Sequence, residues 1–405
     1  MRGSALSLEL ANCNILNVKS GRVTEDSTIT IEGDRIGEVG ARSQRKPGKR
    51  IDLGGSFVLP GLFNMHNHFA IVFPFKDTNQ NESPGITALR GYKRAQDALR
   101  AGVTSVRCVG EINRIDLDMR TMIEAGWVRG PRITAGGRPL GVPGGHGSGL
   151  SQVDCEGPDE FRRAALNELS LGADHLKIFI SGGIAQKGEK LAEPQMTRDE
   201  MEAVVSVASS RGTYVVAHSS GSEQIMIALE AGVKCFEHAY VLNREAARTM
   251  KKMGAWLDPT LTVTRSPAWM REHGFEEWTI EKAVAGGKTH LESIKTAISE
   301  NVKIVCGTDM PPGELNEGVH TIIREMEFIS EAGLSPIETI RASTLYSSEL
   351  CGTADRVGEI QPGYHADLIA VPSNPLEEMI SLRRIRLVMK GGEIIRNELA
   401  GKEKV

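Results

Sequence analysis

Hydrophobic and polar positions alternate over short stretches at both ends of the chain. Residues 7–58 hold several such segments, and Gly33-Asp34 stands between two of them where a hairpin would turn. The same pattern of short apolar segments is found again after residue 352, where turn residues such as Gly391-Gly392 separate them. We therefore expect both chain ends, residues 1–58 and 352–405, to build one small β-sandwich domain around a central insertion.

The central insertion, residues 59–351, has a different period. Strand-like apolar runs alternate there with helical patterns, which favours βα units and a parallel sheet. The expected strands cover residues 63–68, 103–108, 132–136, 175–180, 214–218, 234–238, 256–261 and 303–308. The expected helices cover residues 88–101, 116–125, 159–171, 198–211, 223–231, 245–253, 281–299 and 322–332. Eight βα units in this length predict an α/β fold, a (β/α)8 TIM barrel.

Polar residues that finish the apolar strands are candidates for an active site, because TIM-barrel chemistry sits at the carboxyl ends of the strands. His66 and His68 are two residues apart on the first expected strand, so their side chains face the same side. The fifth and sixth strands end on His218 and His238, and Asp309 follows the eighth. Imidazole and carboxylate groups bind divalent metal ions, so this arrangement predicts a metal centre.

Lys177 lies inside the otherwise apolar fourth expected strand. A buried ammonium is costly, so an inward lysine must be paired, have a lowered pKa or be chemically modified. A neutral amine can react with CO2 to form a carbamate, which is a carboxylate able to bridge two cations. Lys177 is therefore a candidate ligand.

The order His-x-His, Lys, His, His, Asp resembles the pattern of the amidohydrolase superfamily. The stretches at 54–62 and 358–368 also resemble that family's connections between β-sandwich and barrel. The resemblance implies that one divalent cation is held by His66, His68 and Asp309 and a second by His218 and His238. It further implies that N-carboxylated Lys177 and a hydroxide bridge the two ions, expected to be zinc, and that Asp309 carries a proton to the leaving nitrogen.

Within that superfamily the chain most resembles the branch of prolidase-like and carboxypeptidase-like dipeptidases. The similar stretches are residues 177–183 and the glycine-rich loop at 144–147. The resemblance implies cleavage of the amide C–N bond of an N-acyl amino acid or dipeptide. His146 is a candidate catalytic and substrate-binding residue, and Tyr240 and His320 are candidate substrate contacts. For a substrate carboxylate, Arg138, Arg265 and Tyr240 are the candidates.

Two alternatives remain open. A deaminase or a cyclic-amide hydrolase of the imidazolonepropionase kind would use related metal chemistry, although Lys177 favours a binuclear amide hydrolase. A non-catalytic barrel scaffold is the other alternative. Against it stands the number of polar ligand-type residues, since a purely structural barrel has no physical need to gather them at one end.

Composition and charge limit the classes of partner and the cellular compartment that we expect for this protein. Hydrophobic residues make up 40% and charged residues 25% of the chain, and the net charge of −4 gives no attraction to nucleic acid or anionic membrane. The six cysteines stand apart in the sequence and are expected to be reduced thiols. We find neither a secretory signal nor an apolar run of the roughly 20 residues that a membrane helix needs. We therefore expect a cytoplasmic homo-oligomer that acts on a small-molecule amide.

Overall fold

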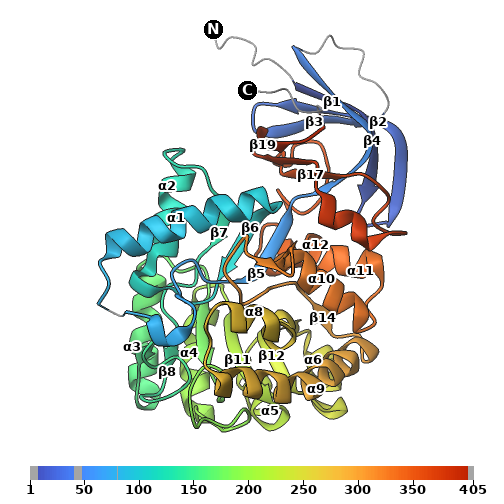
Figure 1. Cartoon of the computed structure of the whole chain (residues 1–405). Coiled ribbons are helices and arrows are strands. Elements are labelled where there is room, and N and C mark those ends of the chain that lie inside the picture. The colour runs from blue at the N-terminus through green and yellow to red at the C-terminus, as the bar shows by residue number, and fades with distance from the viewer. Residues whose placement is uncertain (1–7, 41–47, 80, 400–405) are drawn as a thin grey trace.

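The structure, a computed structural model, describes residues 8–40, 48–79 and 81–399 (Figure 1). An α/β barrel forms the larger part, and the two ends of the chain meet in a β-sheet that lies against one end of the barrel (Figure 1). Residues 1–7, 41–47 and 400–405 of the predicted sandwich domain lie outside the described residues. The domain limits at 58 and 352 remain a prediction, and β4 continues to Pro60.

The two chain ends pair in one seven-stranded sheet in the order β19-β18-β17-β4-β1-β2-β3. Its strands are β1 (Leu8–Asn17), β2 (Arg22–Glu32), β3 (Arg35–Gly40), β4 (Lys49–Pro60), β17 (Leu368–Val371), β18 (Leu387–Lys390) and β19 (Glu393–Asn397). Strand β17 pairs antiparallel with β4, so Ile369 lies opposite Leu59. A single hydrophobic core combines side chains from both ends, among them Leu10, Ile29 and Leu368. The sandwich expected from the sequence is thus one continuous sheet around its own core.

Eight parallel strands form the barrel, each close to its predicted position. They are β5 (Leu62–Asn67), β6 (Val103–Cys108), β7 (Arg132–Thr134), β10 (Leu176–Phe179), β11 (Val215–Gly221), β12 (Cys235–Val241), β13 (Trp256–Asp258) and β14 (Lys303–Ile304). Two short strands, β8 (Leu140–Gly141) and β9 (Val153–Asp154), extend the sheet beside β10. Backbone hydrogen bonds close the ring, from Met65 N to Cys306 O (3.0 Å) and from Asp174 N to Ala135 O (2.7 Å). The predicted TIM barrel is therefore confirmed.

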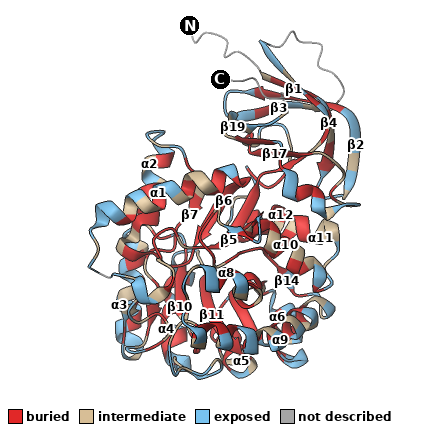
Figure 2. Cartoon of the chain, in the orientation of Figure 1, coloured by how far each residue is buried: buried red, intermediate tan, exposed pale blue. Residues whose placement is uncertain are grey.

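Helices surround the barrel, with their inner faces buried and outer faces exposed (Figure 2). The eight predicted helices correspond to α1 (Pro84–Arg100), α2 (Ile115–Glu124), α3 (Gly157–Ser170), α4 (Arg198–Ser210), α5 (Ser222–Ala231), α6 (Arg244–Met253), α9 (Glu277–Ser299) and α10 (Thr321–Glu331). Their starts follow local signals. At α4, for example, Thr197 and Glu200 form a capping box that satisfies the first backbone N–H groups. Within the described ranges, none of the helices combines the length and apolar character needed to cross a membrane.

Several short elements were not predicted. Helices α7 (Thr262–Arg265) and α8 (Pro267–Glu272) lie between β13 and α9, and a small hairpin of β15 (Leu315–Asn316) and β16 (Val319–His320) follows β14. Helices α11 (Pro336–Ala342) and α12 (Leu345–Leu350) lead back toward the sheet. The start of α11 is an exception, because Ser335-Pro336-Ile337-Glu338 predicts a capped helix start there, and the Ser335 side chain accepts from the Glu338 N–H. These segments are too short to show a clear helical or strand period in the sequence.

Candidate metal centre

The six predicted ligands all line one cavity at the carboxyl ends of the barrel strands. They are His66, His68, Lys177, His218, His238 and Asp309. They come from five different strands or strand ends, so only closure of the barrel brings them together. Their roles as ligands remain a prediction, which the geometry below supports.

Three of these side chains point their metal-binding atoms at one another. His66 Nε2 lies 3.2 Å from His68 Nε2, and Asp309 Oδ1 lies 3.4 Å from each of them. The other ring nitrogens are engaged, because His66 Nδ1 faces Glu237 Oε2 at 2.5 Å and His68 Nδ1 faces the Gly110 carbonyl at 2.7 Å. Those oxygens can only accept, so a neutral ring carries its proton on Nδ1 and presents a lone pair at Nε2. Three converging lone pairs fit a divalent cation.

The remaining two histidines form a second group beside the first. The ring centroids of His218 and His238 are 4.7 Å apart, and those of His238 and His66 are 5.1 Å apart. His218 Nε2 lies 3.2 Å from the Gly182 carbonyl, which leaves its Nδ1 free, and His238 Nδ1 lies 2.6 Å from Thr260 Oγ1, which leaves its Nε2 free. Each ring is therefore held through one nitrogen, as metal-binding histidines commonly are.

Lys177 is the buried group that most needs an explanation. Its side chain is 2% exposed, and its Nζ has no hydrogen-bond partner within the described residues. Burial lowers its pKa below the usual 10.5. The neutral form of an amine is the one that reacts with CO2, and an Nζ without a hydrogen-bond partner beside the histidines and Asp309 fits N-carboxylation of Lys177.

A buried ion pair, which the sequence analysis missed, contacts the Nδ1 side of His66. Arg107 and Glu237 are both fully buried, and Arg107 Nη2 lies 2.7 Å from Glu237 Oε1. Burial alone would raise the pKa of Glu237, but Arg107, His66 and Lys177 hold that pKa well below its ordinary value. Asp258 lies 3.4 Å from the same guanidinium. Arg107 thus balances the charge of Glu237, while burial and the charge of Glu237 raise the pKa of Asp258 well above its ordinary value.

The backbone is strained at two of the predicted ligands. His238 has φ of 65° and Asp309 has φ of 54°, in the left-handed region that residues other than glycine rarely adopt. Ala239 has φ of 54° as well. Side chains at adjacent strand positions normally point to opposite faces. The left-handed backbone at His238 and Ala239 interrupts this alternation, so Glu237 and His238 both reach the centre of the barrel. Strained backbone of this kind is concentrated at functional sites.

His146 lies over the second group of histidines. Its ring stacks on His218 with centroids 4.0 Å apart, and its Nδ1 lies 2.8 Å from Glu189 Oε2. Burial would raise the pKa of Glu189, but the hydrogen bond and charge of His146 and the Gly183 N–H keep it below its usual value. Glu189, which the sequence analysis missed, therefore orients His146 and leaves Nε2 as the atom free for substrate.

Of the other predicted substrate-binding residues, only Tyr240 lies at the candidate metal centre. Tyr240 lines an adjoining cavity that also reaches His218, His238 and Asp309, and its ring stacks on His238 with centroids 5.2 Å apart. His320 lies outside the lining residues of the cavities at this centre, and its Nδ1 is 3.0 Å from the Gly313 carbonyl. Arg138 donates to the Ser151 and Gln152 carbonyls, and Arg265 pairs with Glu331. The geometry therefore gives no support to substrate contacts by His320, Arg138 or Arg265.

Buried His175 behaves as a core residue. It stacks on Tyr214 with centroids 5.6 Å apart, and burial lowers its pKa to about 3. The ring is therefore neutral and packs in the core, away from the candidate ligands.

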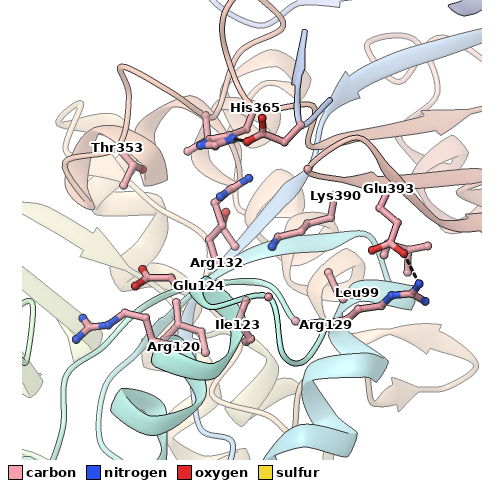
Figure 3. A pocket seen from close by; sticks show the side chains of 18 of the residues that line it. Leu99, Arg120, Ile123, Glu124, Arg129, Arg132, Thr353, His365, Lys390 and Glu393 are labelled. Atoms are coloured by element: carbon pink, nitrogen blue, oxygen red, sulfur yellow. Dashed lines mark ion pairs between the residues drawn. The ribbon is translucent and has the colours of Figure 1, made fainter. Parts of the chain in front are cut away.

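A separate cavity of about 500 Å³ lies at the opposite end of the barrel, between the first strands and the sheet (Figure 3). Arg129 and Glu393 form an ion pair across its rim, and Arg132, His365 and Lys390 point toward its interior (Figure 3). None of the six predicted ligands lines it. The carboxyl ends of the strands therefore remain the candidate active site.

Fold and site together define a metal-dependent hydrolase type of TIM barrel, with a histidine and carboxylate centre at the carboxyl ends of its strands. The model of the amidohydrolase family matches residues 57–395, and the chain belongs to that family. Ochratoxinase from Aspergillus niger is 26% identical over 375 residues, which cover 84% of this chain and 75% of that protein. Imidazolonepropionase from Pseudomonas aeruginosa is 23% identical over 383 residues, covering 89% of this chain and 91% of that protein.

Solved structures agree with this assignment. A prolidase complexed with N-methylphosphonate-L-proline superposes with a TM-score of 0.89 at 27% identity, covering 96% of this chain and 100% of that one. A Xaa-Pro dipeptidase with bound methionine gives 0.86 at 29% identity, covering 96% and 99%. The chain is thus a hydrolase that acts on carbon–nitrogen bonds, near the prolidase-like branch of its superfamily.

Proposed function

We propose that the chain is a binuclear metal-dependent amidohydrolase that cleaves the amide C–N bond of a small N-acyl amino acid or dipeptide. The observation that carries this proposal is the convergence of His66 Nε2, His68 Nε2 and Asp309 Oδ1 within 3.4 Å of one another, beside an unpartnered, buried Lys177. The prolidase and dipeptidase structures support the substrate class by their similarity.

One cation would be held by His66, His68 and Asp309 and the other by His218 and His238, with N-carboxylated Lys177 between them. Two divalent ions, which we propose to be zinc, supply an activated water at neutral pH and polarise the scissile carbonyl. Everything else in the reaction falls to the chain's own side chains.

Asp309 is proposed to move the proton. Burial would raise the pKa of this carboxyl, but the contacts with His66 and His68 hold that pKa below its ordinary value, so Asp309 is in the ionised form that can accept a proton. It would pass that proton to the leaving nitrogen as the C–N bond breaks. His146, held by Glu189 and stacked on His218, presents Nε2 toward the substrate oxygen.

We further propose that the protein works in the cytoplasm as a homo-oligomer and binds neither nucleic acid nor membrane. All six cysteines are free thiols and five of them are buried, as in proteins of a reducing compartment.

The test combines a metal assay with a substrate screen. Protein purified without chelator is expected to hold two equivalents of divalent metal, with zinc foremost, and to release free amine from N-acyl amino acids or dipeptides. Chelation should abolish the release, and re-added metal should restore it. Ammonia release from aminated heterocycles without any amide cleavage would instead identify a deaminase, and metal-free protein with no hydrolase activity would support a scaffold.

A further inference from the structure

A cluster of aromatic side chains, the aromatic subsite, stands over the candidate metal centre. It consists of Phe73, Phe75, Trp269 and Phe275, whose ring centroids lie 4.9–5.9 Å apart in tilted and edge-to-face pairs. Phe73 and Phe75 belong to the connection between β5 and α1, whereas Trp269 is on α8 and Phe275 follows that helix. Two connections far apart in the sequence therefore meet over the barrel mouth.

The aromatic subsite lines a cavity that adjoins the one around the six predicted ligands and shares three of those ligands with it. The rings line it together with His218, His238 and Asp309. Trp269 is 3% exposed, but all three phenylalanines are only half-buried. Their partly exposed ring surface is thus available to a substrate group that reaches the metal centre.

The described residues that line the same cavity include no arginine or lysine side chain that could bind a carboxylate. Among the described residues that line it and the adjoining cavity around the six ligands, there is no arginine, and the only lysine is Lys177, itself a predicted ligand. Recognition of a free carboxylate normally uses arginine or lysine. The walls beside the rings are apolar, with Ile184 and Met270 among them.

We infer that one substituent of the scissile amide is an uncharged aromatic ring, which binds among Phe73, Phe75, Trp269 and Phe275. This inference rests on the proposed function and narrows its substrate class. Edge-to-face contacts favour a flat ring over a saturated ring of similar size. The free space of about 60 Å³ is smaller than the roughly 150 Å³ of an apolar cavity known to bind benzene, so we expect the half-buried phenylalanines to shift when a ring enters.

Matched substrates test the preference in the metal-loaded enzyme. N-benzoyl-glycinamide is compared with its cyclohexanecarbonyl analogue, and N-acetyl-phenylalaninamide with N-acetyl-cyclohexylalaninamide, so that the ring is offered on either side of the amide. In at least one pair the aromatic member should have a KM about three- to tenfold lower. Phe275→Ala and Phe75→Ala should remove that difference, whereas Tyr92→Ala, at an exposed aromatic position on α1, should preserve it.

Binding is also measured without turnover, by titrating the metal-loaded enzyme with benzamide and cyclohexanecarboxamide and following tryptophan fluorescence. Benzamide should bind more tightly, and Phe275→Ala should weaken its binding about three- to tenfold. Benzamide binding that depends on Phe275 would support the aromatic subsite even if the enzyme cleaved no amide. The lack of amide cleavage would then contradict only the proposed function. Equal affinity for both amides, or equal KM within every pair, would overturn the inference.

Discussion

Arg107 and Glu237 form an ion pair in which neither side chain has any exposed surface, and the far oxygen of that carboxylate lies 2.5 Å from His66 Nδ1. Removing one partner of such a pair leaves an uncompensated buried charge, which costs about 3–5 kcal/mol. Arg107→Met should therefore lower the free energy of unfolding by about that amount in a denaturant titration. Arg198→Met is the matched control, because Arg198 and Glu202 form an exposed pair that solvent screens, so its loss should leave the free energy of unfolding nearly unchanged. Equal effects of the two substitutions would contradict the prediction.

Glu237→Gln tests the same contact from the side of the metal. The amide keeps the shape of the carboxylate but loses the charge that fixes the proton of His66 on Nδ1. Loss of such a hydrogen-bond partner typically weakens metal binding about 10- to 100-fold. A competitive chelator titration measures this. Unchanged affinity would show that Glu237 serves only to neutralise Arg107.

Lys177→Ala should abolish binding of the second cation and the hydrolase activity, because no bridging carboxylate can form. In the wild-type protein, incubation with 13C-bicarbonate should give a carbamate signal by NMR, and that signal should be missing from the variant. Short carboxylic acids should restore part of the activity of Lys177→Ala. Lys252→Ala, which removes an exposed lysine on α6, is the control and should leave both readouts unchanged. A fully active, metal-loaded Lys177→Ala would exclude the bridge.

Glu189→Gln should impair His146 without loss of metal. The charge-assisted hydrogen bond to His146 Nδ1 orients the ring over His218, and its loss should lower kcat by about tenfold with a smaller change in KM. Glu193→Gln, an exposed residue on the same segment, should have no effect on either constant. If metal content falls together with kcat in Glu189→Gln, then Glu189 acts on the centre as a whole.

The cost of burying a charge identified Lys177 as a candidate ligand, and the same argument applies to Arg107 and Glu237, which the sequence analysis did not identify. Arg107 and Glu237 also stand inside apolar strands, β6 and β12, where an isolated charge would be costly. Their positions indicate that each charge must be paired or neutralised inside the barrel. That they neutralise each other could not be read from the chain, because the two residues are 130 positions apart and their distance depends on how the barrel closes.

The sequence alone determined the eight strands, their order and the six ligand-type residues at their ends, because apolar runs define buried strands and parallel strands end at the same rim. The tertiary structure alone decided which side chains meet there. It brought Glu189 to His146 and an aromatic cluster over the centre, and it placed His320, Arg138 and Arg265 elsewhere. The physical reason is that connections have no period to reveal their path, so the positions of their side chains follow only from packing in three dimensions.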